Sequence, residues 1–187
     1  MRTRERLITT ASEVIKRKGY FGTGINEVLA AVGVPKGSLY HHFPAGKDEL
    51  IREAVVHGGR SHLRRYGEAL RGKQVMDGLF AVIDAMIVEL RDSDFRDACP
   101  IAAVAVASGS INEDIRAACD AVFARWEGAL AVYLKRCGVE GAAEKAKELY
   151  VLFEGAYILA KAHRNVAYLE LQKRFIPTVI AIETLEK

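Results

Sequence analysis

The sequence predicts an all-α protein, and three observations lead to this fold class. The chain of 187 residues contains only four prolines, the residues that interrupt helices most strongly. Apolar residues recur at intervals of three and four along most of the chain, as on one face of a helix. No segment shows the alternation of apolar and polar residues that indicates a half-buried strand. We therefore expect the chain to fold as helices alone.

Nine helices are expected, divided between a small N-terminal domain and a larger C-terminal one. Half of the residues are apolar and 27% are charged, so the chain can bury a core without disulfides or metal ions. The expected domains are residues 1–46 and 47–187. The expected helices cover approximately residues 4–18, 26–32, 35–43, 47–66 or beyond, 74–91, 100–108, 112–137, 142–165 and 167 to the C-terminus.

Glycine and proline mark the ends of the first three helices. Gly19 is expected to end the first helix, after three consecutive cations near its negative end. Thr23 or Gly24 caps the second helix. A tight turn follows at Gly33, and Pro35 opens the third helix because its missing N–H has no helical partner there.

The remaining helices are mostly longer. The fourth begins at Lys47 and contains Gly58 and Gly59, each costing about 1 kcal/mol relative to alanine. This glycine pair is either an accident of sequence or a flexible point through which a ligand signal reaches the N-terminal domain. In the last helix, Pro177 is expected to kink or break the chain because it removes a hydrogen bond.

Charge is distributed unevenly along the chain. Residues 1–65 carry a net charge of +6, whereas residues 66–187 carry −3. Four of the five histidines also lie in the first segment. A basic N-terminal segment on a mildly acidic remainder indicates a polyanion as the partner of that segment alone.

The cysteines and the apolar runs indicate a cytoplasmic protein without a membrane partner. Cys99, Cys119 and Cys137 are odd in number and widely spaced, unlike a disulfide framework or a zinc site. The first residues lack the apolar run of a signal peptide. The longest small or apolar run, residues 98–107, is shorter than the roughly 20 residues that span a bilayer.

Two short helices joined by a glycine turn, after a longer helix, form the pattern of a helix-turn-helix. In the second short helix, Leu39 and Phe43 lie four residues apart and can anchor it to its neighbours. The other side chains from 36 to 42 include a lysine, a serine, a tyrosine and two histidines. These groups bind phosphate oxygens and base edges, so the pattern predicts a DNA recognition helix.

Individual residues of this region have expected roles. The expected contacts to base edges are Lys36, Ser38 and His41. The expected contacts to phosphates are Thr23, Tyr40, His42 and Lys47, and Gly37 allows close approach of the backbone. His41 and His42 could instead bind a metal ion, but adjacent helical residues point about 100° apart and cannot chelate one ion together. We expect no metal site and no cofactor.

A longer pattern surrounds the recognition helix. It consists of Gly19-Tyr20, Thr23-Gly24-Ile25, the string from Ala31 to Phe43, and Lys47-Asp48-Glu49-Leu50. With these residues, positions 7–55 resemble the DNA-binding domain of TetR-type transcriptional regulators. Gly24 and Pro35 depart from that family, which has hydroxyl residues there. The resemblance implies a homodimer whose recognition helices enter successive major grooves, about 34–36 Å apart, on an inverted-repeat operator.

Three further segments resemble one subgroup of this family. Residues 41–47, 98–105 and 154–156 are similar to segments of the LmrA/YxaF-like subgroup, although Ala45 and Ala98 stand where glycines are expected. This similarity implies a repressor that senses a small, mostly apolar, often aromatic molecule. The genes under its control would serve efflux or detoxification.

A ligand cavity between the C-terminal helices follows from the same resemblance. The expected lining residues are Phe80, Met86, Cys99, Val104, Trp126, Leu130, Phe153 and Tyr157. Any one of these is more readily explained as a core residue, and only the set favours a cavity. Cys99 also precedes a helix start, where a thiolate is favoured, so a redox-sensing role is an alternative to simple packing.

The last two helices are apolar on more than one face, which a lone domain of this size would leave partly in water. A two-fold interface between these helices from two subunits would bury them, and the family resemblance implies the same dimer. The expected interface residues are Val151, Ile158, Phe175, Ile176, Val179 and Ile180.

The sequence therefore predicts a sequence-specific, DNA-binding repressor that a small molecule releases from its operator. An enzyme is not expected, because the motifs of serine hydrolases, zinc proteases, P-loop proteins and dinucleotide-binding proteins are absent. Two alternatives remain open. One is a module that regulates through a protein partner without a ligand, and the other is an activator.

Overall fold

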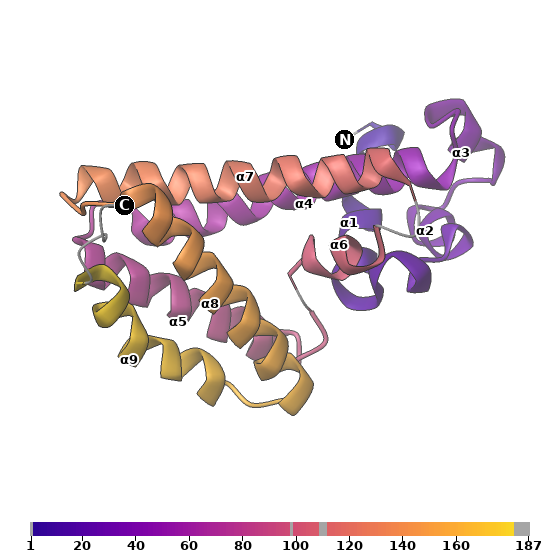
Figure 1. Cartoon of the computed structure of the whole chain (residues 1–187). Coiled ribbons are helices and arrows are strands. Elements are labelled where there is room, and N and C mark those ends of the chain that lie inside the picture. Colours follow the sequence, from indigo (N-terminus) through magenta and orange to yellow (C-terminus); the bar gives the residue numbers. More distant parts are fainter. Residues whose placement is uncertain (1, 98, 109–111, 182–187) are drawn as a thin grey trace. The chain divides into compact units, whose positions relative to one another are not determined.

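The computed structural model describes residues 2–97, 99–108 and 112–181 (Figure 1). Regular secondary structure in these residues is entirely helical, which confirms the expected all-α class. The described helices are α1 (Thr3–Gly22), α2 (Ile25–Val32), α3 (Gly37–His42), α4 (Lys47–Leu70), α5 (Val75–Asp92), α6 (Ala102–Ser108), α7 (Glu113–Arg136), α8 (Ala142–His163) and α9 (Ala167–Ala181).

Helix α1 extends beyond its expected end. Gly19 interrupts the helical geometry with a φ of 64° and a ψ of −169°, but the helix resumes and continues to Gly22. A positive φ strongly favours glycine. A Cβ at position 19 would also lie 3.2 Å from the carbonyl oxygen of Ala103 in α6. Gly19 therefore ends the first regular stretch of helix, as expected, and makes a kink that lets α1 approach α6 closely before one more short helical stretch reaches Gly22.

Helix α3 is shorter than expected because Pro35 lies outside it. The N–H of Ser38 donates to the Pro35 carbonyl at 2.9 Å, so the proline shapes the entry turn and does not open the helix. Phe43 follows the helix with an extended φ of −138°. Before this turn, α2 ends at Gly33, which adopts the left-handed conformation of a C-cap with a φ of 73°.

Helix α4 runs without interruption through the glycine pair. A Cβ at Gly59 would lie 2.5 Å from Val122 Cγ1 of α7. A Cβ at Gly58 would lie 2.8 Å from the Ser12 hydroxyl and 3.2 Å from Pro100 Cβ. Both glycines thus permit close packing of α4 against α1, the start of α6 and α7. This packing explains the pair, and the proposed flexible point is not supported.

The last helix continues through its proline. Helix α9 extends past Pro177 to Ala181, so of the two expected outcomes, a kink or a break, the break does not occur. Ile176 is fully buried, and the carbonyl oxygen of Ile180 accepts a hydrogen bond from the buried Lys145 ammonium at 2.9 Å. These contacts hold the chain on both sides of the proline, which offsets the backbone hydrogen bond that it removes.

The chain divides into two compact units. The first unit consists of Met1–His62 and Cys99–Phe123, and the second of Leu63–Ala98 and Ala124–Lys187. The long helices α4 and α7 contribute to both units. The first unit therefore contains α1, α2, α3 and α6 together with the first parts of α4 and α7.

The second unit is built around α5, α8 and α9. Helix α9 packs against both α5 and α8. Tyr133 of α7 fixes the start of α5, because its hydroxyl donates to the Gln74 carbonyl at 3.0 Å. Gly78 makes room for this side chain, since a Cβ there would lie 2.0 Å from the Tyr133 hydroxyl oxygen. None of the described helices is long and apolar enough to cross a bilayer.

Candidate nucleic-acid interface

Helix α3 has an apolar anchor and a polar outer face. Leu39 and Phe43 are buried in the first unit, as the sequence predicts. Lys36, Gly37, Tyr40 and His41 are exposed, and Ser38 and His42 are half-buried. A Cβ at Gly37 would meet no atom within 4 Å, so the backbone there is open to a large partner. The helix thus presents hydrogen-bond donors on a surface that the core does not need.

The two adjacent histidines lie at the end of this helix. Their ring centroids are 4.7 Å apart and their planes are inclined by 68°. Within the part of the chain that the structure describes, no group of three or more His, Cys, Asp or Glu side chains could hold a metal ion. The two imidazole rings lie beside the other polar residues of α3 and offer further hydrogen-bonding groups there.

Thr23 occupies a different environment from the other candidate DNA contacts. Its side chain is buried, and its hydroxyl donates to the Gly19 carbonyl at 2.6 Å. This bond closes the kinked end of α1 just before α2. Because a phosphate oxygen needs a donated hydrogen, Thr23 could bind a phosphate only by giving up the bond to Gly19.

Lys47, at the start of α4, is half-buried and held against α1. Its ammonium donates to the Tyr20 carbonyl at 3.1 Å and lies 4.4 Å from the centroid of the Tyr20 ring. An ammonium group carries three donors, so this arrangement fixes the charge in place and still leaves donors for a phosphate. The backbone N–H groups of the first turn of α4 lie beside it, where they also attract anions.

Two arginines of α1 hold the helix-turn-helix in place. Arg4 forms an ion pair with Glu53 at 2.7 Å, and its guanidinium lies 5.1 Å from the centroid of the Phe43 ring. Arg6 donates to the carbonyl oxygen of Val32, the last residue of α2, at 2.6 Å. These roles were not predicted from the sequence, because basic residues at the start of α1 are equally consistent with a general electrostatic attraction to DNA.

Asp48 connects three helices of the first unit. It accepts hydrogen bonds from the Tyr20 hydroxyl of α1 at 2.6 Å and from Asn112, beside α7, at 2.7 Å. Burial, together with the bond to Asp48 and its negative charge, raises the pKa of Tyr20 to about 12. The partners of Asp48 are 28 and 64 residues away in the sequence, so no local pattern could have indicated this connection.

The expected ligand-binding residues are divided between the two units. Cys99 and Val104 are buried in the first unit, where the Cys99 sulfur accepts the Ala102 N–H at 3.5 Å. The others belong to the second unit, where Phe80 is half-buried and the rest are buried: Met86, Trp126, Leu130, Phe153 and Tyr157.

Tyr150 links two of the expected ligand-binding residues. Its ring centroid lies 6.2 Å from that of Trp126 and 6.3 Å from that of Phe153. Tyr150 was not among the expected ligand-binding residues, because it falls on another face of α8 than Phe153. An open groove of about 500 Å³ lies elsewhere, in the first unit, beside Arg52 and Ala118. None of the expected ligand-binding residues lines it.

A polar pair in the second unit, the buried Tyr66 and the half-buried Glu89, was also missed by the sequence-based prediction. The Tyr66 hydroxyl donates to Glu89 at 2.8 Å, and Arg65 pairs with the same carboxylate at 3.1 Å. Burial, followed by the charges of Glu89 and Tyr157, raises the pKa of Tyr66 well above its ordinary value. This pair places hydrogen-bonding groups close to Tyr157, in a unit whose expected lining is otherwise almost entirely apolar.

The expected dimer residues differ in exposure. Val151, Ile158 and Phe175 are exposed, with 73%, 52% and 47% of their surface accessible. Val179 and Ile180 are half-buried, whereas Ile176 is fully buried inside its own unit. Helices α8 and α9 thus leave apolar side chains in water, although Ile176 is not one of them.

Comparisons with known proteins match both ends of the chain to one family. Residues 7–54 match bacterial regulatory proteins of the tetR family, and residues 75–174 match the C-terminal domain of LmrA/YxaF-like transcriptional regulators. An uncharacterized HTH-type regulator of Mycobacterium tuberculosis H37Rv, Rv0196, is 35% identical over 193 residues, with 98% of this chain and 97% of the relative covered. YxaF of Bacillus subtilis is 30% identical over 184 residues, with 95% of each chain covered.

A further relative has a solved structure. The HTH-type transcriptional repressor NemR of Escherichia coli is 28% identical over 193 residues, with 96% of this chain and 94% of NemR covered. The crystal structure of its reduced form superposes with a TM-score of 0.85 at 24% identity, covering 98% of this chain and 99% of that chain. The chain therefore belongs to the TetR family, with an LmrA/YxaF-like C-terminal domain, and is a DNA-binding transcriptional regulator and not an enzyme.

Proposed function

We propose that this protein is a dimeric, cytoplasmic repressor that binds an inverted-repeat operator and leaves it when a small, mostly apolar or aromatic molecule binds. The observation that carries the proposal is the division of α3 into a buried anchor and a polar outer face. The name of the related NemR, a repressor, supports repression over activation. In this proposal residues 1–46 form the DNA-binding domain, and residues 47–187 bind the effector and the second subunit.

The DNA contacts are assigned by exposure and chemistry. Lys36, Ser38 and His41 contact base edges, where their donors can distinguish bases in the major groove. Tyr40, His42 and Lys47 contact phosphates and set the position of the helix. Gly37 allows the backbone to approach the groove. Thr23 joins the phosphate contacts only if binding breaks its hydrogen bond to Gly19.

The second subunit covers the exposed apolar surface of α8 and α9. Val151, Gly155 and Ile158 follow one another at helical spacing on α8, and all three are exposed. A Cβ at Gly155 would meet nothing within 4 Å in its own chain, so a neighbouring helix could approach the backbone closely there. Phe175 extends the surface onto α9. Sedimentation equilibrium of the full chain measures the assembly, and a monomer at micromolar concentration contradicts it.

The effector site is assigned to the second unit. Trp126, Tyr150 and Phe153 form a group of neighbouring aromatic rings. The buried Tyr66 and the half-buried Glu89 add polar groups, which are suited to a hydrogen bond with an otherwise apolar molecule. An effector acts only through its different affinities for the bound and released conformations, so it need not touch the DNA-binding residues.

A selection experiment tests the DNA-binding part of this proposal. The purified protein is incubated with a pool of random DNA duplexes at fixed salt, and bound duplexes are sequenced after several rounds. An enriched inverted repeat with half-sites about one helical turn or a multiple apart is expected. Enrichment of a single half-site contradicts binding of the operator by a dimer. Absence of any enriched sequence, with the protein folded and dimeric, contradicts it as well.

Two further measurements test repression and release. Transcription in vitro from a promoter that overlaps the enriched repeat should fall when the protein is added, whereas an increase identifies an activator. A panel of apolar aromatic compounds should contain at least one that lowers affinity for the repeat and raises the protein's melting temperature. Failure of every compound to do both favours regulation through a protein partner.

A further inference from the structure

Asp48, in the first turn of α4, accepts two hydrogen bonds, one from α1 and one from the residue that precedes α7. Its Oδ1 atom accepts the Tyr20 hydroxyl at 2.6 Å, and its Oδ2 atom accepts the Asn112 side-chain amide at 2.7 Å. All three residues belong to the first unit. Asp48 is therefore the common attachment point of α1 and of the residue that opens α7.

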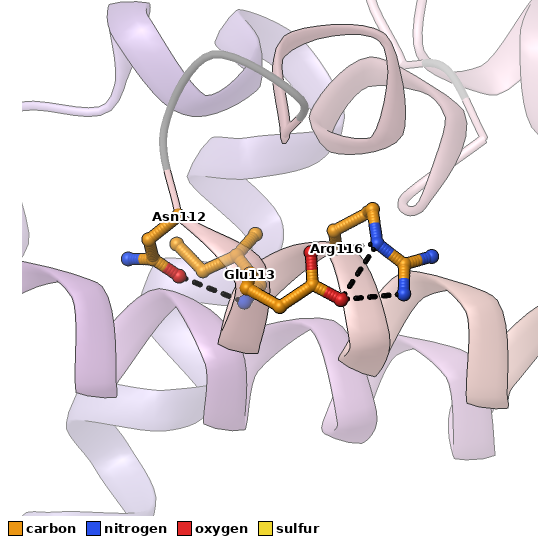
Figure 2. Close-up of polar contacts among 4 residues, drawn as sticks. Asn112, Glu113 and Arg116 are labelled. Atoms are coloured by element: carbon orange, nitrogen blue, oxygen red, sulfur yellow. Dashed lines mark hydrogen bonds and ion pairs between the residues drawn. The ribbon is translucent and has the colours of Figure 1, made fainter.

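Asn112 uses both ends of its side-chain amide. Its Oδ1 atom accepts the N–H of Ile115 at 2.9 Å and so caps the start of α7 (Figure 2). Its Nδ2 atom donates to Asp48. The orientation of the amide is fixed by its partners, because a backbone N–H can only donate and a carboxylate can only accept. Serine, threonine and aspartate also cap helices, but ionised aspartate has no donor, and the single hydroxyl of serine or threonine lacks the separate nitrogen with which asparagine donates to Asp48 while its oxygen caps the helix.

The first turn of α4 is held firmly to α1 and lies close to α3. Lys47 and Asp48, which are consecutive, both bind Tyr20, one at its carbonyl oxygen and one at its hydroxyl. Only residues 43–46 separate this turn from the end of α3. A displacement of the first turn of α4 would therefore be passed to the recognition helix through a very short connection.

We propose that Asn112 is a positioning residue for DNA recognition. Through Asp48 it holds the first turn of α4, and with it the orientation of α3, while its capping bond ties that orientation to the start of α7. A change at the start of α7 would then change the presentation of α3 to DNA without touching DNA itself. The inference needs DNA binding by α3 but is independent of effector release.

Three variants separate the two bonds of Asn112. Asn112→Ser keeps an oxygen that can cap α7 but removes the amide nitrogen that donates to Asp48. Asn112→Asp keeps the cap and places a second carboxylate against Asp48. The double variant Asp48→Asn with Asn112→Asp exchanges the two groups, so an amide donor again faces a carboxylate acceptor. Circular dichroism establishes that each variant retains its helical content before binding is measured.

The expected affinities for the selected duplex follow from these changes. Loss of a hydrogen bond to a charged group should weaken binding about tenfold in Asn112→Ser. Asn112→Asp should bind more weakly still, because two carboxylates repel each other. The exchanged double variant should recover to within about threefold of the natural protein, since the two sites are directly coupled. A purely structural cap would show no such recovery, because all three variants retain it.

Hydrogen exchange supplies a readout that needs no effector. In the natural protein, DNA binding at α3 should slow amide exchange in the first turn of α7, because coupling between two sites acts in both directions. This slowing should disappear in Asn112→Ser. Even without DNA, the first turn of α4 should exchange faster in that variant. A failed selection for an operator therefore leaves this part of the test intact.

Glu113→Gln is the matched control. Glu113 neighbours Asn112 and pairs with Arg116 at 2.6 Å (Figure 2), and its side chain is largely exposed. This variant should keep the natural affinity and exchange pattern. The proposal is overturned if Asn112→Ser binds and exchanges like the natural protein. It is also overturned if the exchanged double variant binds no better than Asn112→Asp alone.

Discussion

The two units of the molecule use polar side chains in opposite ways. In the first unit, α3 exposes Lys36, Tyr40 and His41 while Leu39 holds the helix to the core. In the second unit, the Tyr66 hydroxyl is buried among residues that form the core and donates to the half-buried Glu89. The proposed DNA-binding surface is thus separate from the residues that stabilise the fold, whereas the proposed effector site coincides with them.

This difference determines how each unit can be tested. Replacing an exposed residue of α3 should change DNA affinity and leave stability nearly unchanged. Replacing Trp126 or Phe153 should lower stability whether or not an effector binds there, because both are buried. Effector binding therefore has to be measured alongside unfolding for every variant of the second unit.

The largest expected effect comes from the glycines of α4, which crosses both units. Gly59→Ala should lower the free energy of unfolding by roughly 3 kcal/mol, because its Cβ would meet the stiff, buried Val122 side chain at 2.5 Å. A Cβ at Gly67, on the second-unit part of the same helix, would meet no atom within 4 Å. Gly67→Ala should therefore raise the free energy of unfolding by up to about 1 kcal/mol. Urea unfolding of both variants measures the contrast, and equal midpoints would refute the packing role of Gly59.

Helix spacing and the recognition motif could be predicted from the sequence, because both are local patterns. The positions of α1 to α9 and the outward face of α3 follow from residues three and four apart. The geometry at Pro35 and Pro177 was predicted less well. At Pro177 it depends on contacts from other elements, such as the hydrogen bond from Lys145 of α8 to the Ile180 carbonyl.

The supports of the site could not be predicted at all. Asp48 is an ordinary acidic residue in the first turn of a helix until Asn112, 64 residues later, is brought to it. The sequence predicts that Thr23 caps α2 or contacts a phosphate. In the structure its hydroxyl instead donates to the carbonyl of Gly19, at the kink of α1. In the second unit, an apolar stripe gives the same pattern for a core and for a cavity wall, so the sequence favours a core role for each single residue and indicates a cavity only through the whole set.

The next effect concerns base recognition by the first unit. Lys36→Ala should lower affinity for the selected duplex by about 2 kcal/mol, or roughly thirtyfold, and leave the unfolding midpoint unchanged. Affinity for random duplexes should fall far less, because base-edge contacts contribute to specific binding only. Fluorescence anisotropy with both duplexes measures the ratio. An equal loss on both would show that Lys36 contacts phosphate.

A smaller and more uniform effect is expected at Lys47. Lys47→Ala should weaken binding to all duplexes by about 1 kcal/mol and reduce the salt dependence of the binding constant by about one unit of slope. Lys147→Ala is the control from the second unit, where the lysine is exposed on α8. It should change neither quantity. A loss confined to one base position would contradict the phosphate role of Lys47.

The smallest effect distinguishes one cysteine in each unit and needs no substitution. Burial raises the pKa of Cys119, in the first unit, to about 11, whereas Cys137 in the second unit is half-buried. Because the thiolate is the reacting form, alkylation of Cys119 at pH 8 should be much slower than that of Cys137. Its rate should still rise about tenfold per pH unit up to pH 9.5, since the thiol remains mostly protonated there. Mass spectrometry of the native protein after timed iodoacetamide treatment measures both rates, with urea-unfolded protein as the control. Equal native rates would mean that Cys119 is not enclosed by α7 and its neighbours, and that the first unit opens as readily as the surface of the second.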